Sequence, residues 1–138
     1  MERNVVTIKI IMTMPYHKLI AWQKSHEFFI EVYRVSTKFP PHELFGVTSQ
    51  LRRAALSSVL NIVEAQARGT AKEYIRFLTI SRASLAECGF ILECSRDLGY
   101  IDGEMCAKLE AIRDEAHRLT NGIITRLRRD VAIKNQKR

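Results

Sequence analysis

Apolar residues between positions 47 and 68 fall on two opposite sides of one predicted helix. Successive side chains turn by about 100° in an α-helix, so the two sets form separate stripes. A helix at a protein surface needs one apolar stripe, and a second stripe indicates burial against another chain. We therefore predict that the chain self-associates. The inner stripe comprises Val47, Leu51, Ala54, Ser58, Ile62 and Ala65, and the outer stripe comprises Leu56, Leu60, Val63 and Ala67.

Helical periodicity continues through most of the chain and predicts helices at about 15–38, 47–68, 71–98 and 103–129. Pro40 and Pro41 end the first helix, because proline lacks a backbone donor. Thr70 and Glu73 form a capping box for the third helix, and Asp102 is a suitable N-cap for the fourth. Short connections make successive helices antiparallel neighbours. The predicted fold is an all-α, antiparallel up-down-up-down four-helix bundle over residues 15–130, assembling as a ring-shaped homo-oligomer.

The predicted helix at 15–38 also has two apolar sides. We expect its larger stripe to face the core of the bundle and its smaller stripe to face a neighbouring subunit. The predicted core stripe comprises Leu19, Trp22, His26, Phe29, Ile30 and Tyr33. The predicted subunit interface comprises Phe28, Val32, Val35, Leu56, Leu60 and Val63.

Both ends of the chain lie outside the predicted bundle. Residues 1–14 are expected to be a disordered extension or a short strand, because Val6, Ile8 and Ile10 alternate with polar residues. Lys9 interrupts the apolar run and no cleavage site follows, so a signal peptide is not expected. Residues 131–138 are expected to be a fraying basic tail.

The net charge of +7 is concentrated near the carboxyl end. A basic excess suits nucleic acid, but it also serves solubility or attraction to a membrane surface, and these alternatives stay open. No apolar run reaches the length of a transmembrane helix, so no membrane partner is expected. Residues 126–138 contain Arg126, Arg128, Arg129, Lys134, Lys137 and Arg138 against the single acid Asp130.

Few residues have the spacing that catalysis or metal binding requires. A di-iron bundle needs Glu-x-x-His on two helices, and the nearest match is Asp114 with His117. Cys88, Cys94 and Cys106 are odd in number and lie on apolar faces, as reduced thiols of a cytoplasmic protein do. We expect no enzyme activity, no cofactor and no metal.

Several short motifs resemble those of a known family, namely Trp22-Gln23-Lys24, Phe39-Pro40, Phe45-Gly46, Gln50-Leu51-Arg52-Arg53-Ala54, Asn61-Ile62 and Phe77-Leu78. The family is the four-helix-bundle proteins encoded by intervening sequences in bacterial 23S ribosomal RNA genes. The resemblance implies a homopentamer without enzyme activity. It also implies kinship with the accessory variability determinant protein of diversity-generating retroelements, a basic pentamer that binds nucleic acid and a reverse transcriptase.

The predicted function is a non-enzymatic oligomeric scaffold that binds RNA or DNA, alone or together with a protein partner. Arginine forks match phosphate oxygens, so binding would depend on the phosphate backbone and on salt. A structural protein–protein adaptor is the alternative. Gln50, Asn61 and Glu64 would form either a ligand site or a hydrogen-bond network between helices. The candidate phosphate contacts are Arg52, Arg53, Arg68, Lys72, Arg76, Arg118, Arg126, Arg128 and Arg129.

Overall fold

The computed structural model describes residues 2–137, with side chains from residue 8 onward. Every regular element in this range is helical, which confirms the all-α prediction. Two short 3₁₀ turns, η1 (Tyr16–Lys18) and η2 (Pro41–Glu43), lie between the longer helices. The α-helices are α1 (Glu2–Thr13), α2 (Ile20–Ser36), α3 (Val47–Gln66), α4 (Ala71–Asp97) and α5 (Gly103–Gln136).

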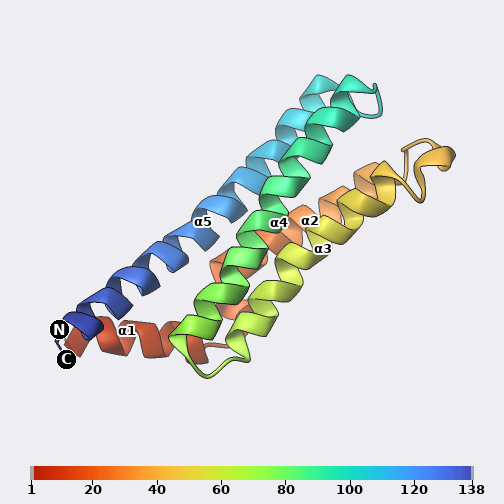
Figure 1. The fold of residues 1–138 in the computed structure, drawn as a ribbon. Coiled ribbons are helices and arrows are strands. Elements are labelled where there is room, and N and C mark those ends of the chain that lie inside the picture. Colours follow the sequence, from red (N-terminus) through yellow and green to blue (C-terminus); the bar gives the residue numbers. More distant parts are fainter. Residues whose placement is uncertain (1, 138) are drawn as a thin grey trace.

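Helices α2–α5 form two hairpins that pack against each other (Figure 1). Hydrogen bonds join Ser58 to Ser81 and Gln66 to Tyr74, so α3 and α4 run in opposite directions. The bonds between α4 and α5 follow the same reversed order. Short connections therefore place the α3–α4 turn at one end of the bundle and the other two connections at the opposite end (Figure 1).

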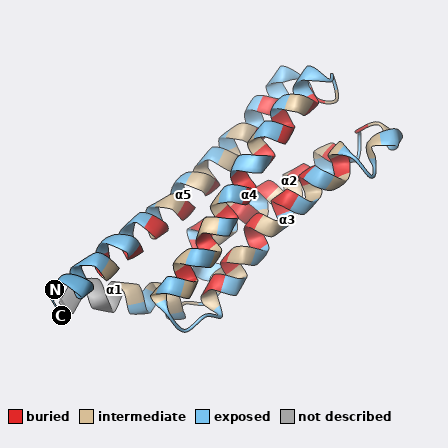
Figure 2. Cartoon of the chain, in the orientation of Figure 1, coloured by how far each residue is buried: buried red, intermediate tan, exposed pale blue. Residues whose placement is uncertain are grey.

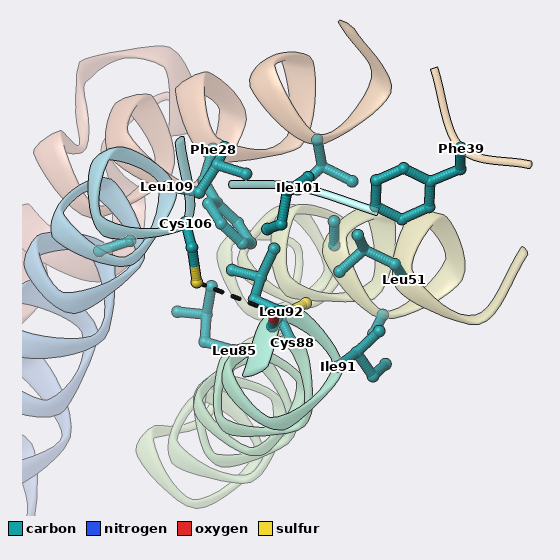
Figure 3. Close-up of a cluster of buried hydrophobic side chains, with 14 residues drawn as sticks. Phe28, Phe39, Leu51, Leu85, Cys88, Ile91, Leu92, Ile101, Cys106 and Leu109 are labelled. Atoms are coloured by element: carbon teal, nitrogen blue, oxygen red, sulfur yellow. Dashed lines mark hydrogen bonds between the residues drawn. The ribbon is translucent and has the colours of Figure 1, made fainter. Parts of the chain in front are cut away.

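Buried residues lie mainly where these helices face one another (Figure 2). They form two apolar clusters. The upper cluster is centred on Phe28, Leu85 and Leu109, near the α4–α5 connection (Figure 3). The lower cluster includes Ile62 and Leu127, near the α3–α4 turn. The predicted inner stripe of α3 is confirmed, because Leu51, Ala54, Ser58, Ile62 and Ala65 are all buried.

Each of α2–α5 also contributes a fully buried hydroxyl to the interior. The Oγ of Ser81 donates a hydrogen bond of 2.6 Å to the backbone oxygen of Ser58. A side chain on α4 can reach the backbone of α3 only where the residues between the helices are small. These residues therefore set the close approach of the two helices. The fully buried serine and threonine residues are Ser25, Ser58, Ser81, Ser95 and Thr120.

The predicted helix boundaries at the two polar caps are confirmed. The backbone nitrogen of Glu73 donates to Oγ1 of Thr70 at 3.2 Å, as in a capping box. The backbone nitrogen of Met105 donates to Oδ1 of Asp102 at 2.7 Å. Gly99 follows α4 with φ of +77°, a conformation that glycine adopts readily.

The amino-terminal segment differs from the prediction of a strand or disorder, because residues 2–13 form helix α1. This helix crosses the lower end of the bundle (Figure 1). Ile8, Ile11 and Met12 pack against the lower cluster. Their spacing of three and four residues is helical, and this signal outweighs the short alternation that suggested a strand. Met1 lies outside the described residues.

The carboxyl end also differs from the prediction, because α5 continues to Gln136 instead of ending near residue 129. Leu127 is fully buried and Asp130 is only 8% exposed, so α5 is packed as far as Asp130. Its last residues, from Ala132 onward, are exposed. At the start of the predicted helix 15–38, η1 precedes α2, which begins only at Ile20. Arg138 lies outside the described residues.

Candidate nucleic-acid and subunit interfaces

Three of the predicted phosphate contacts meet at the α3–α4 turn. Arg68 follows α3, while Lys72 and Arg76 lie on the first turns of α4. The Cζ atom of Arg68 lies 4.6 Å from the ring centroid of Phe77, and that of Arg76 lies 5.6 Å away. The aromatic ring thus holds two guanidinium groups on one surface.

The acids beside this cluster neutralise it only weakly. Arg68 pairs with Glu64 at 3.4 Å, and Arg76 pairs with Glu73 at 3.8 Å. All four side chains are more than a third exposed, and such pairs contribute little free energy. Lys72 is exposed and forms no ion pair within the described part of the chain. A phosphate group could therefore replace these carboxylates without breaking packed structure.

A second set of cations lies on the last third of α5. Arg126, Arg128 and Arg129 are exposed and make no ion pair with any residue between 8 and 137. The end of α5 and the α3–α4 turn lie at the same end of the bundle (Figure 1). Arg118 is exposed too, but it lies about 12 Å from Arg126 along the helix axis. We call Arg68, Lys72, Arg76, Arg126, Arg128 and Arg129 the basic end.

The remaining two predicted contacts lie elsewhere. Arg52 packs between α3 and α2, where its Nε donates to Oγ of Ser36 at 2.8 Å. Its guanidinium also lies 4.6 Å from the ring centroid of Tyr33. Arg53 is exposed, but about 22 Å of α3 separates it from Arg68. The structure therefore does not bring Arg52 or Arg53 to the basic end.

The predicted outer stripe of α3 is exposed on the bundle surface. Leu56 is 36% exposed and Leu60 is 52% exposed, while Val63 is half-buried. Ile80 on α4 is 39% exposed. Because Ser58 bonds to Ser81, Leu60 and Ile80 lie on neighbouring turns of the paired helices. Together they extend the outer stripe from α3 to α4.

The predicted interface residues of α2 are wrong. Phe28 and Val32 are fully buried in the upper cluster, and Val35 packs against it. The stripe that faces the core continues through the small or polar residues Ala21 and Ser25. Counting large apolar residues gives such small residues no weight. The prediction therefore took the core-facing side of α2 for the subunit interface.

The predicted core stripe of α2 lies partly on the surface as a row of neighbouring aromatic rings. The Trp22 and His26 rings are 4.8 Å apart and nearly parallel, and the Phe29 and Tyr33 rings are 5.0 Å apart. Tyr33 is 40% exposed, and the other three are half-buried. Arg52 reaches this row from α3, so the row runs beside the α2–α3 contact. The sequence did not predict this exposed row, because aromatic residues at helical spacing were assigned to the core.

The predicted polar trio on α3 does not converge on one site. Gln50 donates to Glu87 at 2.6 Å, Asn61 donates to the backbone oxygen of Ser57 at 2.8 Å, and Glu64 pairs with Arg68. These are separate contacts within and between helices. They favour the hydrogen-bond network over a ligand site.

Two of the three cysteines are buried in the core. Burial raises the pKa of the Cys88 thiol to about 12, so the thiol stays protonated at neutral pH. Cys106 is also buried, with its Sγ 3.8 Å from the backbone oxygen of Leu92 (Figure 3). Among the described residues, no three His, Cys, Asp or Glu side chains are placed to hold a metal ion. Nor does any helix in this range have the length and hydropathy needed to cross a membrane.

The fold and these surfaces define a small all-helical bundle protein with a basic end. A family model described as "23S rRNA-intervening sequence protein" matches residues 17–122, which is most of the chain. The chain therefore belongs to the 23S rRNA-intervening sequence protein family, as its motifs suggested. Helix α1 lies before the matched region.

A solved structure shares the fold. It is a crystal structure of a protein with unknown function from the S23 ribosomal protein family of Bacteroides thetaiotaomicron. The TM-score is 0.72 at 23% sequence identity, and the match covers 77% of this chain and 96% of that one. A search of curated proteins gives no significant match.

Proposed function

We propose that this protein is a non-enzymatic, basic homo-oligomer that binds RNA or DNA through the phosphate backbone. The observation that carries the proposal is the basic end, where two helix ends and one turn gather cations that are unpaired or weakly paired. Arginine and lysine at such a surface release counterions when they meet phosphates. The free cysteines, two of them buried, suit a cytoplasmic protein.

Self-association would multiply this surface. The exposed outer stripe supports a subunit contact, because contiguous apolar side chains at a surface favour a partner. In a ring, which we propose to be a pentamer, each subunit would contribute one basic end. Repeated sites on one particle raise the local field and the avidity for a polyanion. A nucleic acid long enough to reach two subunits would then bind more tightly than a short one.

The proposal is tested with a salt series on a labelled single-stranded RNA and a duplex DNA of equal length. The test variant reverses three cations of the basic end: Arg68→Glu, Lys72→Glu and Arg76→Glu. Each lost phosphate contact lowers the salt slope by about one, so the slope should fall by about two to three. At low salt the affinity should fall at least about tenfold.

The matched control reverses three cations at the opposite end: Arg34→Glu, Arg96→Glu and Lys108→Glu. Two of these are likewise paired to a neighbouring acid and one is not, so the control has the same charge and similar losses. It should keep most of the affinity. Equal losses of affinity in both variants would show a general effect of net charge. If the unmodified protein binds neither RNA nor DNA at low salt, the proposal fails and the adaptor alternative remains.

A further inference from the structure

Phe45 is an apolar side chain that the subunit leaves in water. It lies in the connection between α2 and α3, and it is 94% exposed. Phe39 in the same connection is 6% exposed, so the connection buries one phenylalanine and presents the other. An aromatic side chain buries roughly 150–250 Å² when it finds a partner. The exposed ring of Phe45 therefore gains a large apolar contact only when a second molecule covers it.

The connection that carries Phe45 is firmly held. The hydroxyl of Tyr100 donates to Oε2 of Glu43 at 3.0 Å, and the rings of Phe39 and Tyr100 are 5.7 Å apart. Gly46 fits tightly, because a Cβ there would lie 2.7 Å from Oε1 of Glu43. Phe45 is thus projected from a braced turn, and bracing lowers the entropy cost of binding.

A groove between α4 and α5 offers space for an aromatic ring. Its volume is about 630 Å³, and its lining combines Gly89, Phe90 and Cys106 with four charged residues, Arg113 among them. A Cβ on Gly89 would lie 2.9 Å from Cζ of Arg113, so the glycine lets the guanidinium lie against α4. There the guanidinium donates to the backbone oxygen of Leu85 at 3.3 Å.

One group of the groove is a natural partner for phenylalanine. Phe90 is 67% exposed and offers a ring for edge or offset stacking. The guanidinium of Arg113 is held by Glu110 at 2.8 Å and Asp114 at 2.7 Å, so it forms a fixed wall of the groove. The charges beside the two features are complementary as well: Lys38 and Glu93 are exposed, and neither forms an ion pair within the described residues.

We propose that Phe45 of one subunit occupies the α4–α5 groove of a second copy of this chain. The inference rests on the self-association in the proposed function and names its anchor. Phe45 and the α3 part of the outer stripe belong to the same hairpin, so a neighbour that covers the stripe can also receive the ring. Anchor and groove lie on different surfaces of the subunit, so each copy can receive a ring from one neighbour and insert its own into another, in a head-to-tail arrangement. Contacts of this kind close into rings when the rotation allows.

The first test compares Phe45→Ala with the unmodified protein by sedimentation over a range of concentrations. Truncating a central aromatic anchor should raise the concentration of half-dissociation at least about tenfold. Ile20→Ala is the control, because Ile20 is 57% exposed but lies at the start of α2, away from both features. It should assemble normally. Circular dichroism should show both variants folded.

A mixing experiment tests the head-to-tail geometry. Gly89→Leu fills the groove and displaces the flexible guanidinium of Arg113 from α4. Leucine is favoured over glycine in a helix by somewhat less than ~1 kcal/mol, so the fold should survive. Phe90→Ser removes the ring from the groove as an independent second variant. Phe45→Ala and Gly89→Leu should each assemble poorly alone. When mixed, the two variants should form 1:1 dimers that do not extend. Gly89→Leu supplies an intact Phe45, and Phe45→Ala supplies an intact groove.

The outcomes separate the two proposals. If the unmodified protein is monomeric, the proposed self-association fails. If it assembles and Phe45→Ala assembles equally well, only the anchor fails. If the two variants do not rescue each other in the mixture, the head-to-tail contact is rejected. Nucleic-acid binding is measured separately and is contradicted by none of these results.

Discussion

Gln66 should act as the clasp that holds α1 against the bundle. Its side-chain nitrogen donates to the backbone oxygens of Ile11 at 2.9 Å and Met14 at 2.6 Å. Its side-chain oxygen accepts a hydrogen bond from the hydroxyl of Tyr74, a residue with no exposed surface. One residue at the end of α3 thus connects α1 to α4.

Replacing Gln66 with leucine should destabilise the fold more than a substitution near a helix end usually does. Two hydrogen bonds are lost at about 1 kcal/mol each, and the buried hydroxyl of Tyr74 loses its partner at about 1–3 kcal/mol. We expect Gln66→Leu to lower the free energy of unfolding by about 3–5 kcal/mol in a urea titration. Hydrogen exchange should show α1 opening more than the rest of the bundle.

Two further variants check this reasoning. Gln23→Leu removes an exposed side chain that donates once, to the backbone oxygen of His17 at 2.9 Å, and should cost about 1 kcal/mol or less. Adding Tyr74→Phe to Gln66→Leu removes the orphaned hydroxyl, so the double variant should lose less than the sum of the single losses. The clasp is refuted if Gln66→Leu costs no more than Gln23→Leu and leaves the exchange of α1 unchanged.

Three other predictions follow from burial and capping. Leu60→Glu should dissociate the oligomer yet stay helical by circular dichroism. Ile62→Glu should instead unfold the chain, because Ile62 has no exposed surface. If Leu60→Glu unfolds, the assignment of Leu60 to an exposed outer stripe is contradicted. The raised pKa of Cys88 stabilises the fold fully below pH 9 and loses that stabilisation as pH rises toward 12, by up to about 4 kcal/mol. The free energy of unfolding of Cys88→Ala, measured in urea, should fall less steeply over that pH range than that of the unmodified protein. An unchanged slope would exclude the Cys88 thiol as a source of the pH dependence. Thr70→Ala should cost about 1 kcal/mol through the lost cap, and no change in the urea midpoint would rule the cap out as a source of stability.

The fold was largely predictable because its main signals are local. Thr70 and Asp102 cap helices through bonds to residues three positions on, and Gly99 ends one through its own φ angle. The inner stripe of α3 also follows directly from a 3.6-residue period. Such signals depend on neighbouring residues alone, so sequence is enough to read them.

The surfaces were harder to predict because they depend on which side of a helix meets its neighbours. On α2, Ala21 and Ser25 are buried while Trp22 and Tyr33 remain partly exposed, the reverse of what side-chain hydropathy suggests. Small residues allow the helices to approach, and large rings then remain at the rim. This choice is made by packing between distant segments.

The basic end was predictable only in part for the same reason. Arg68, Lys72 and Arg76 are neighbours through the turn and the helical period, so their grouping was visible in the sequence. The orientation of Arg68 over Phe77, and the engagement of Arg52 with α2, required the tertiary structure. Phe45 likewise stood in a recognised motif, but nothing in the motif indicated that its ring is exposed.

The molar mass of the unmodified protein in solution tests the central claim most directly. Light scattering after size-exclusion chromatography, over a wide range of loading concentrations, reports how many 15.9 kDa chains associate. We expect a single species several times that mass, stable on dilution. A particle of 15.9 kDa that persists at the highest concentration would contradict the ring, its anchor and the shared basic surface together.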